Sequence, residues 1–253
     1  MTHYIDINCD MGESFGKYTK GRDPEVMPYV TTANIAAGFH AGDPHVMRRT
    51  VALADEHDVT IGVHPGLPDK LGFGRRTMDA SPEEVRDYVV YQLGALRAFA
   101  DQLGADFQHV KPHGAMYTML SESEAHARAV VEGVLEVDED LIYLATDTNV
   151  YEVAREYPIR AAYEGYVDLD YRQDCSVVIP KDKTARDPDL VADRFFSIAT
   201  EGTVETPEGE VLDVPADSIC VHGDTPNVVE ILQEIHGRLD EEDVELRSVA
   251  DVV

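Results

Sequence analysis

Residues 60–111 read TIGVHPGLPDKLGFGRRTMDASPEEVRDYVVYQLGALRAFADQLGADFQHVK, and this stretch decides the fold because it holds a complete strand–helix–strand unit. Its two ends, Thr60–His64 and Gln108–Lys111, are predicted as strands. Between them, SPEE at 81–84 combines an N-cap serine, a proline at the first helical position and a capping-box glutamate. Apolar residues then recur at helical spacing, which predicts a helix over Pro82–Leu103.

The same alternation of short apolar runs and longer amphipathic segments continues along the chain. The predicted strands are Tyr4–Asn8, Thr32–Ala36, Thr60–His64, Gln108–Lys111, Leu141–Ala145, Ala161–Tyr166 and Ser218–Val221. The predicted helices are Pro44–His57, Pro82–Leu103, Glu122–Val137, Asn149–Glu156, Pro188–Glu201 and Pro226–Leu239. Repeated strand–helix units imply parallel strands with right-handed crossovers. We therefore predict a single α/β domain over residues 1–253, a (β/α) barrel-like fold with about seven parallel strands; an open doubly wound sheet is the alternative.

Three segments interrupt this alternation. The Gly-rich stretch Pro65–Ala80 and the long polar stretch Asp168–Asp187 each follow a predicted strand. Barrel and open α/β enzymes place their binding loops at such positions. Gly202–Pro215 is predicted as a small hairpin with its turn at Pro207–Gly209.

The charge balance is strongly acidic, with 49 Asp and Glu residues against 21 Lys and Arg residues and a formal net charge of −28. Nucleic acid and anionic lipid repel such a chain, so we expect neither nucleic acid nor a membrane as a partner. Only six residues are lysines. High acidity with little lysine is the pattern of a salt-adapted surface, which we state as a hypothesis about the host.

The cysteines and the first residues indicate the compartment. Cys9, Cys175 and Cys220 are odd in number and form no CxxC pair, which fits a reducing environment. Residues 1–6 show no basic region or apolar run of a signal peptide, and no apolar stretch is long enough for a membrane span. We expect a cytoplasmic protein, and the sequence leaves open whether copies associate into a homo-oligomer.

The unusual polar residues follow the predicted strands at their carboxyl ends. They are Asp6, Asn8, Asp10, Glu13, Asn34, His40, Asp43, His64, Lys111, His113, Glu164, Asp168, His222 and Asp224. In a parallel sheet these positions converge on one face. Acids, imidazoles and a lysine gathered in this way are suited to hydrolysis of an unactivated amide.

Two features of these residues favour a functional role rather than an ordinary solvent-exposed polar surface. Asp6, Asn8 and Asp10 alternate along a strand, so they share one side, and three inward polar groups are costly without a purpose. Lys111 is one of few lysines and stands at a strand end beside His113, where a buried amine needs a partner or a role.

A metal site is an alternative hypothesis for part of this set. Asp10, His40 and His64 could together hold a divalent metal, because a carboxylate and two imidazoles form a reasonable hydrolytic ligand set. No HExxH motif or other tight ligand spacing supports this hypothesis.

The motifs that contain these residues closely resemble the LamB/YcsF family, the A subunits of prokaryotic 5-oxoprolinases. The matching stretches are IDINCDMGESFG (5–16), ANIAAGFHAGDPHVMRRTV (33–51), HPGLPDKLGFGRR (64–76), HVKPHGAMY (109–117) and ICVHGDTP (219–226). Their length and order make the resemblance specific, and together they span nearly the whole chain.

The resemblance implies a barrel related to glycoside hydrolases and carbohydrate deacetylases. It also implies cleavage of 5-oxoproline (pyroglutamate) to L-glutamate, coupled to ATP hydrolysis, with the B and C subunits of 5-oxoprolinase as partners that activate the lactam by phosphorylation. Residues 12–18, GESFGKY, lack the spacing of a P-loop. We therefore expect ATP to bind on the partner subunits, with this chain opening the ring.

Three positions depart from the family pattern. Ala37 stands where the family usually has cysteine, which argues against a catalytic thiol there. Leu169 and Lys181 replace frequent arginines, and the loss of an arginine alters how a carboxylate or phosphate is held. The identity of the substrate is therefore less secure than the class of reaction.

We assign expected roles to the converging residues. Asp10 would act as general base, with Glu13 as its substitute, and His40 or His113 would donate a proton. Lys111 would stabilise developing negative charge.

The other candidates are expected to bind substrate. Arg75 and Arg76 would hold a carboxylate or a phosphate. The remaining expected binding residues are Asp6, Asn8, Asn34, Glu164, Asp168, His222 and Asp224. Two rival functions stay open: a stand-alone metal-dependent amidase or deacetylase, and a non-catalytic scaffold that docks the partner subunits.

The acidic surface leads to a first prediction. If it is salt-adapted, the unfolding temperature should rise from low to molar KCl, because salt screens the repulsion among carboxylates. Circular dichroism melting across a KCl series measures this. Equal unfolding temperatures at both ends would reject salt adaptation.

Overall fold

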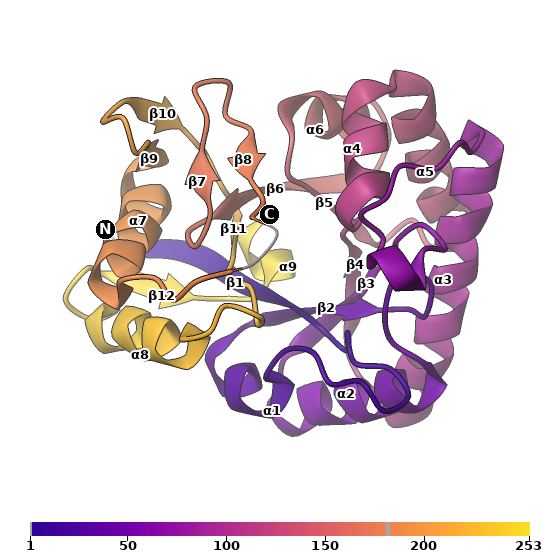
Figure 1. Ribbon diagram of the computed structural model, residues 1–253, viewed down its shortest axis with the longest axis horizontal. Helices are drawn as coiled ribbons and strands as arrows, with labels where there is room; N and C mark the ends of the chain where they lie inside the picture. Colours follow the sequence, from indigo (N-terminus) through magenta and orange to yellow (C-terminus); the bar gives the residue numbers. More distant parts are fainter. Residues whose placement is uncertain (1, 181–182) are drawn as a thin grey trace.

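The computed structural model describes residues 2–180 and 183–253, and within them seven parallel strands close into a barrel (Figure 1). Around the barrel lie β1 (His3–Met11), β2 (Thr32–Ala36), β3 (Thr60–His64), β4 (Phe107–Val110), β5 (Ile142–Ala145), β6 (Arg160–Tyr166) and β11 (Ser218–Cys220). The closing pair is β1 with β11, in which Asp6 lies opposite Ser218. The predicted barrel is confirmed, and the open sheet is excluded because the pairing of β1 with β11 closes the strand order into a ring.

The first strand is longer than predicted and has a second partner. β1 continues to Met11, and its first residues, His3–Ile5, pair with β12 (Val244–Leu246), a strand that the sequence did not indicate. The extension places Asp10 on the strand itself, so its side chain has a fixed direction.

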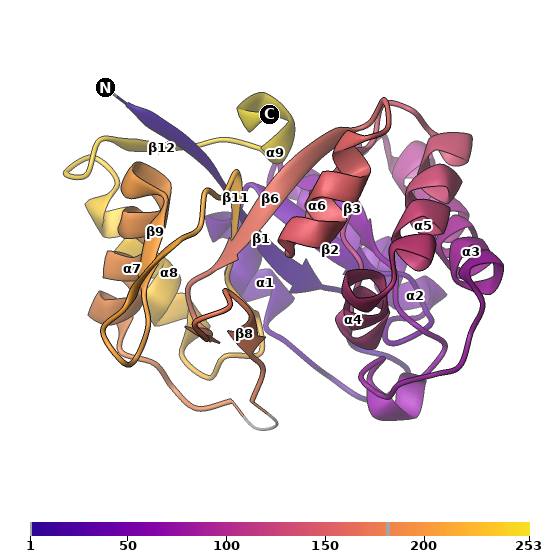
Figure 2. The ribbon, with the colours of Figure 1, turned by 90° about the horizontal axis from the view of Figure 1, so that it is seen from above.

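Helices surround the strands in Figure 2. The predicted ones are present as α2 (Pro44–Glu56), α3 (Pro82–Leu103), α5 (Glu124–Val137), α6 (Thr148–Arg155), α7 (Pro188–Glu201) and α8 (Val228–Arg238). Unpredicted short elements are α1 (Asp23–Val26), η1 (Met27–Tyr29), η2 (Lys70–Gly72), α4 (Gly114–Glu122) and α9 (Val249–Val252). None of the described helices combines the length and the apolar character that crossing a bilayer requires.

The helix starts test the capping predictions. Ser81 forms the complete capping box with Glu84, as predicted, and Asp43 accepts hydrogen bonds from the first backbone amides of α2. The predicted start of the last long helix at Pro226 is wrong, because α8 begins at Val228. The Thr225 hydroxyl donates to Asp168 instead of capping the helix.

Two of the three interrupting segments contain hairpins. The predicted hairpin is confirmed as β9 (Thr203–Glu205) with β10 (Val211–Asp213). The long connection after β6 forms a second, unpredicted hairpin from β7 (Asp170–Tyr171) and β8 (Val177–Val178). Lys181 lies outside the described residues.

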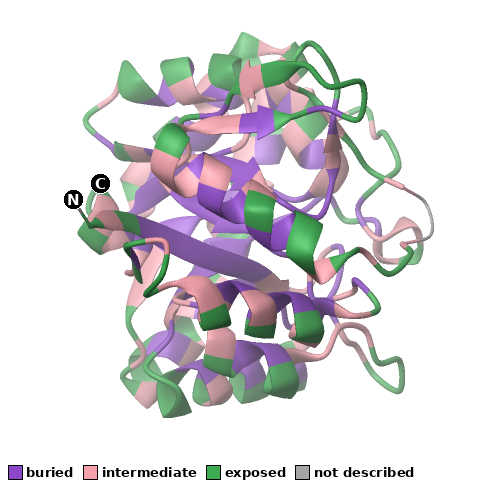
Figure 3. Cartoon of the chain, turned by 90° about the vertical axis from the view of Figure 1, so that its left-hand side faces the viewer, coloured by how far each residue is buried: buried purple, intermediate pink, exposed green. Residues whose placement is uncertain are grey.

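The strands of the barrel are largely buried, as Figure 3 shows, and their two faces carry different side chains. Ile5, Ile7 and Met11 of β1 join the apolar layer beneath the helices. The alternate residues Asp6 and Asn8 point into the barrel and are fully buried. The barrel interior is therefore polar, and apolar burial that stabilises the fold lies mainly between strands and helices.

Candidate active site

The carboxyl ends of the strands bring five predicted side chains to one rim of the barrel. Asp10 comes from β1, His64 from β3, Glu164 from β6, and Lys111 and His222 from just after β4 and β11. The convergence expected from the sequence is confirmed for these positions.

Lys111 lies at the centre of this rim, between two carboxylates. Its Nζ is 2.8 Å from Asp10 Oδ1 and 2.8 Å from Glu164 Oε1, and its side chain is only 3% exposed. Burial opposes the charged amine, but Asp10, Cys220 and Glu164 outweigh it and raise the pKa of Lys111 well above its usual value. Burial likewise opposes the charge of Asp10, but His64 and Lys111 hold the pKa of this carboxyl well below its usual range. Asp10, Lys111 and Glu164 form a buried ion-paired triad.

A hydrogen-bonded polar column supports the triad from inside the barrel. Asn34 Nδ2 donates to Asp10 Oδ1 at 3.0 Å and to Asn8 Oδ1 at 2.7 Å. Asn8 Nδ2 donates to Ser218 Oγ at 2.7 Å, and Ser218 donates to Asp6. Burial raises the pKa of Asp6 to about 6. Asp6, Asn8 and Asn34 were expected to bind substrate, but none of them lines a cavity: Asn34 and Asn8 contact the lining residues Asp10 and Lys111, and Asp6 lies deeper, bound to Ser218.

Three histidines and a glutamate form a second cluster beside the triad. His40 stacks on His113 with ring centroids 3.8 Å apart, and His113 Nδ1 is 3.0 Å from His64 Nε2. His40 Nε2 is 4.0 Å from Glu13 Oε1, and one ligand atom from each of Glu13, His40, His64 and His113 lies within 4.8 Å of the others. The structure thus joins His40 and His64 of the expected metal set with Glu13 and His113, while Asp10 contacts the cluster through His64 at 3.2 Å.

The hydrogen bonds of the His64 and His113 rings to backbone carbonyls place the remaining nitrogens of the two rings face to face. His64 Nδ1 lies 2.7 Å from the Lys111 carbonyl oxygen, and His113 Nε2 lies 2.8 Å from the Phe73 carbonyl oxygen. Carbonyls only accept, so both nitrogens carry protons. In neutral rings, the two lone pairs would then face each other at 3.0 Å. The arrangement requires an extra proton or a cation between them.

His40 is fixed by its surroundings. Gly66 and Gly74 contact it closely, and a Cβ at either position would clash with the His40 side chain. Within the described residues, neither ring nitrogen of His40 has a hydrogen-bond partner although the side chain is fully buried. Buried nitrogens of this kind are rare, and both are available to a ligand.

Burial also controls protonation in this cluster. It lowers the pKa of His113 to about 3 and that of His40 well below its usual value. It raises the pKa of Glu13 to about 8. At neutral pH, these shifts favour neutral forms of all three side chains.

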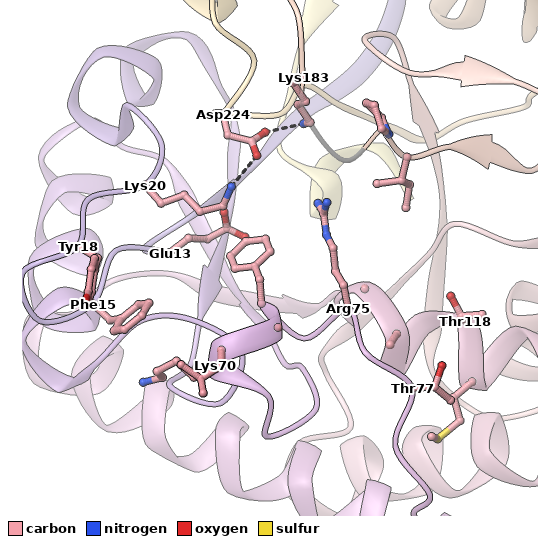
Figure 4. Close-up of a pocket in the computed structure, with 18 of the residues that line it drawn as sticks. Glu13, Phe15, Tyr18, Lys20, Lys70, Arg75, Thr77, Thr118, Lys183 and Asp224 are labelled. Carbon is pink, nitrogen blue, oxygen red and sulfur yellow. Dashed lines mark hydrogen bonds and ion pairs between the residues drawn. The ribbon is translucent and has the colours of Figure 1, made fainter.

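Two adjoining cavities open above these groups. The barrel-mouth cavity has a volume of about 460 Å³ and is lined by Asp10, His64, Lys111, His113 and His222 among others. The second, which we call the lysine-lined cavity, is about 1530 Å³ and is lined by Lys20, Lys70 and Lys183 (Figure 4). Glu13, Arg75 and Asp224 line both.

The remaining expected binding residues separate into two groups. Arg75 and Asp224 reach the cavities, whereas Arg76 donates to Asp69 and lines neither. Asp168 is buried behind the wall, where it lies 2.8 Å from His222 Nδ1. Burial opposes its charge, but His222 and Lys183 lower the pKa of Asp168 far below its usual value.

Several site residues escaped the sequence analysis. Tyr166 donates from its hydroxyl to Glu164 at 2.6 Å, and His109 Nε2 lies 2.6 Å from Asn34 Oδ1. Lys20 and Lys183 both contact Asp224, at 2.6 and 2.5 Å. The scarcity of lysine in the sequence is a signal that indicates Lys20 and Lys183 as well as Lys111.

The closed parallel barrel with its polar site at the carboxyl rim defines this molecule as a (β/α)-barrel protein arranged as barrel enzymes are. The chain belongs, more particularly, to the LamB/YcsF family, whose sequence model matches residues 5–253.

Full-length relatives agree with this assignment. The chain is 46% identical to a Pyrococcus furiosus protein named as the A subunit of 5-oxoprolinase, over 98% of this chain and 99% of that protein. It is 43% identical to a Pseudomonas aeruginosa protein named as the first of its 5-oxoprolinase A subunits, over 96% and 98%.

Solved structures support the fold. The "Lactam Utilization Protein" of Thermus thermophilus has a TM-score of 0.89 and 37% identity, and the match covers 97% of this chain and 99% of that one. The catalytic domain of a peptidoglycan N-acetylglucosamine deacetylase from Eubacterium rectale has a TM-score of 0.51 and 12% identity, covering 100% and 91%. The second likeness concerns the fold alone.

The triad gives a stability prediction. Lys111→Met should lower the free energy of unfolding by about 3–5 kcal/mol, because it leaves two buried carboxylates without their counter-charge. Urea denaturation measures this loss. The matched control is Lys17→Met, which removes an exposed lysine and should change stability by about 0.5 kcal/mol at most.

A second substitution tests the cause of that loss. Adding Glu164→Gln to Lys111→Met should recover part of the stability, since one uncompensated charge is removed. Equal stability of the Lys111→Met and Lys17→Met variants would contradict the triad.

Proposed function

We propose that this chain opens the ring of 5-oxoproline to give L-glutamate, as the A subunit of a multi-subunit 5-oxoprolinase. The observation that carries the proposal is the Lys111–Asp10 pair at the floor of the barrel-mouth cavity, in a chain whose full-length relatives bear the name of that component. The name "Lactam Utilization Protein" of the similar solved structure supports the same class of substrate.

A lactam is a resonance-stabilised amide, so it requires activation before water can attack. We propose that the partner B and C subunits phosphorylate the lactam oxygen with ATP, because the sequence of this chain has no P-loop motif. Water then adds to the ring carbon and transfers a proton to Asp10. Lys111 stabilises the negative charge that develops in this step.

Ring opening next breaks the C–N bond, and the nitrogen takes up a proton. His113, with a pKa of about 3, is a poor source of this proton at neutral pH. Glu13 lines both cavities and has a pKa of about 8, so in the metal-free protein it retains a proton for donation. We therefore assign this step to Glu13 rather than to His40 or His113. Water finally hydrolyses the resulting acyl phosphate to glutamate and phosphate.

The test of this function reconstitutes the chain with candidate B and C subunits and follows glutamate release from 5-oxoproline with and without ATP. Asp10→Asn should lower turnover by roughly a hundredfold or more while the protein stays folded. Asp55→Asn, an exposed change in α2, is the control with the same loss of charge. Wild-type turnover by Asp10→Asn would reject Asp10 as the base.

The same assay separates the rival functions. Glutamate release without ATP that a chelator abolishes would favour a stand-alone metal-dependent amidase. Full activity of the complex after Lys111→Ala and His113→Ala would favour a scaffold.

The histidine cluster supports a metal as a further component of this site. His40, His64 and His113 supply imidazole donors typical of zinc, and a cation among them would satisfy one orphaned His40 nitrogen and the facing nitrogens of His64 and His113. The residues present therefore fit a divalent metal. Bound there, such an ion would supply Lewis acidity.

Metal binding gives a prediction independent of activity. The purified chain should bind about one Zn²⁺ or Co²⁺ per molecule, measured by calorimetry and elemental analysis. His40→Ala should abolish this binding, and His45→Ala, an exposed histidine of α2, should retain it. Unchanged binding by His40→Ala would exclude the cluster as the site.

A further inference from the structure

Lysine is scarce in this chain, yet it is concentrated beside the site. Of the six lysines in the sequence, three within the described residues, Lys20, Lys70 and Lys183, line the same cavity. Arg75 adds a fourth cation to that lining. A surface with a net charge of −28 thus contains a local concentration of positive charge next to the barrel mouth.

Fixed contacts hold these cations at the cavity wall. Lys20 and Lys183 lie on either side of Asp224, as Figure 4 shows. Lys20 Nζ is 4.4 Å from the centre of the Phe73 ring, and the Arg75 guanidinium is 5.3 Å from the same ring. The phenyl ring therefore keeps two like charges close together.

The guanidinium N–H groups of Arg75 are available to a ligand. Within the described part of the chain, no hydrogen bond or ion pair is formed by its guanidinium, and it projects towards Lys183 in Figure 4. The neighbouring Arg76, in contrast, is bound to Asp69. Lys70 Nζ has a backbone carbonyl, that of Gly42, as its hydrogen-bond acceptor at 2.8 Å, and its charge is not neutralised by that contact.

The two adjoining cavities have opposite charge. Among the described residues of the lysine-lined cavity, four cations outnumber the three carboxyl groups of Glu13, Glu122 and Asp224. The described lining of the barrel-mouth cavity has three cations, Arg75, Lys111 and Arg172, against six carboxyl groups. A multiply charged anion is therefore attracted to the first cavity and repelled by the second.

We propose that the lysine-lined cavity is a phosphate-binding subsite, with Arg75, Lys70, Lys20 and Lys183 as its cationic groups. This inference rests on the proposed function: the phosphate of the activated substrate lies in this cavity while its ring lies over Asp10. Glu13, Arg75 and Asp224 line both cavities, so one ligand can extend from one to the other. The guanidinium of Arg75 supplies the forked donors that suit phosphate oxygens.

Inorganic phosphate is the probe for a binding test on the whole isolated chain. Calorimetric titration at constant KCl should show saturable binding to the wild type. Arg75→Ala and Lys70→Ala should each weaken it by about tenfold, as expected for loss of a charge-assisted hydrogen bond. Lys17→Ala removes the same charge from the same surface region but lines neither cavity, so its affinity should stay within about twofold of the wild type. No binding by the wild type, or equal weakening by Lys17→Ala, would overturn the subsite.

ATP titrations identify the source of the phosphate. ATP binding that inorganic phosphate displaces and Arg75→Ala weakens would support the subsite with a nucleotide as ligand. Phosphate binding without ATP binding would support it with a phosphorylated substrate as ligand.

Reconstitution with partner subunits separates this inference from the proposed function. A wild-type complex that makes no glutamate, with Arg75-dependent phosphate binding intact, would reject the function and leave the subsite standing. An active wild-type complex whose Arg75→Ala variant keeps both kcat and KM would reject the subsite alone.

Discussion

The buried amine of Lys111 is the group on which the rest of the site depends. It joins three strands of the barrel, because Asp10 lies on β1, Glu164 on β6, and Lys111 itself follows β4. Removing these charges from water is costly, and the attraction among them offsets that cost only when every remaining donor and acceptor is satisfied. The hydrogen-bonded column of Asn34, Asn8, Ser218 and Asp6 meets this requirement beneath the charged groups.

The same demand explains the polar barrel interior. His109 fills the space beside Asn34, and Gly62 on the adjacent strand has no side chain because a Cβ there would clash with the His109 ring. Apolar stabilisation must then come from the layer between strands and helices, to which Ile7 and Leu93 belong. The barrel thus has a polar centre for chemistry and an apolar outer layer for stability.

How far the sequence predicts this structure depends on whether the information is local. Strand–helix alternation and the SPEE cap are local, and both were predicted correctly; the alternation of Asp6, Asn8 and Asp10 likewise gave the strand face that points inward. The contact of Lys111 with Glu164 joins distant segments, so no local pattern could indicate it. The helix start predicted at Pro226 was wrong because of another distant contact: Asp168 accepts a hydrogen bond from the Thr225 hydroxyl, and the helix begins at Val228.

Two unsatisfied features of the site concern positive charge. Facing nitrogens of His64 and His113 require a proton or a cation, whereas Arg75 is a cation whose donors have no acceptor among the described residues. The first lies at the barrel mouth, where carboxyl groups are in excess, and the second borders the lysine-lined cavity, where cations are in excess. The phosphate of an activated substrate is therefore favoured in the lysine-lined cavity rather than at the barrel mouth. That placement follows from the charges of the walls, and it keeps the phosphate away from Asp10, where added negative charge would oppose the attack of water.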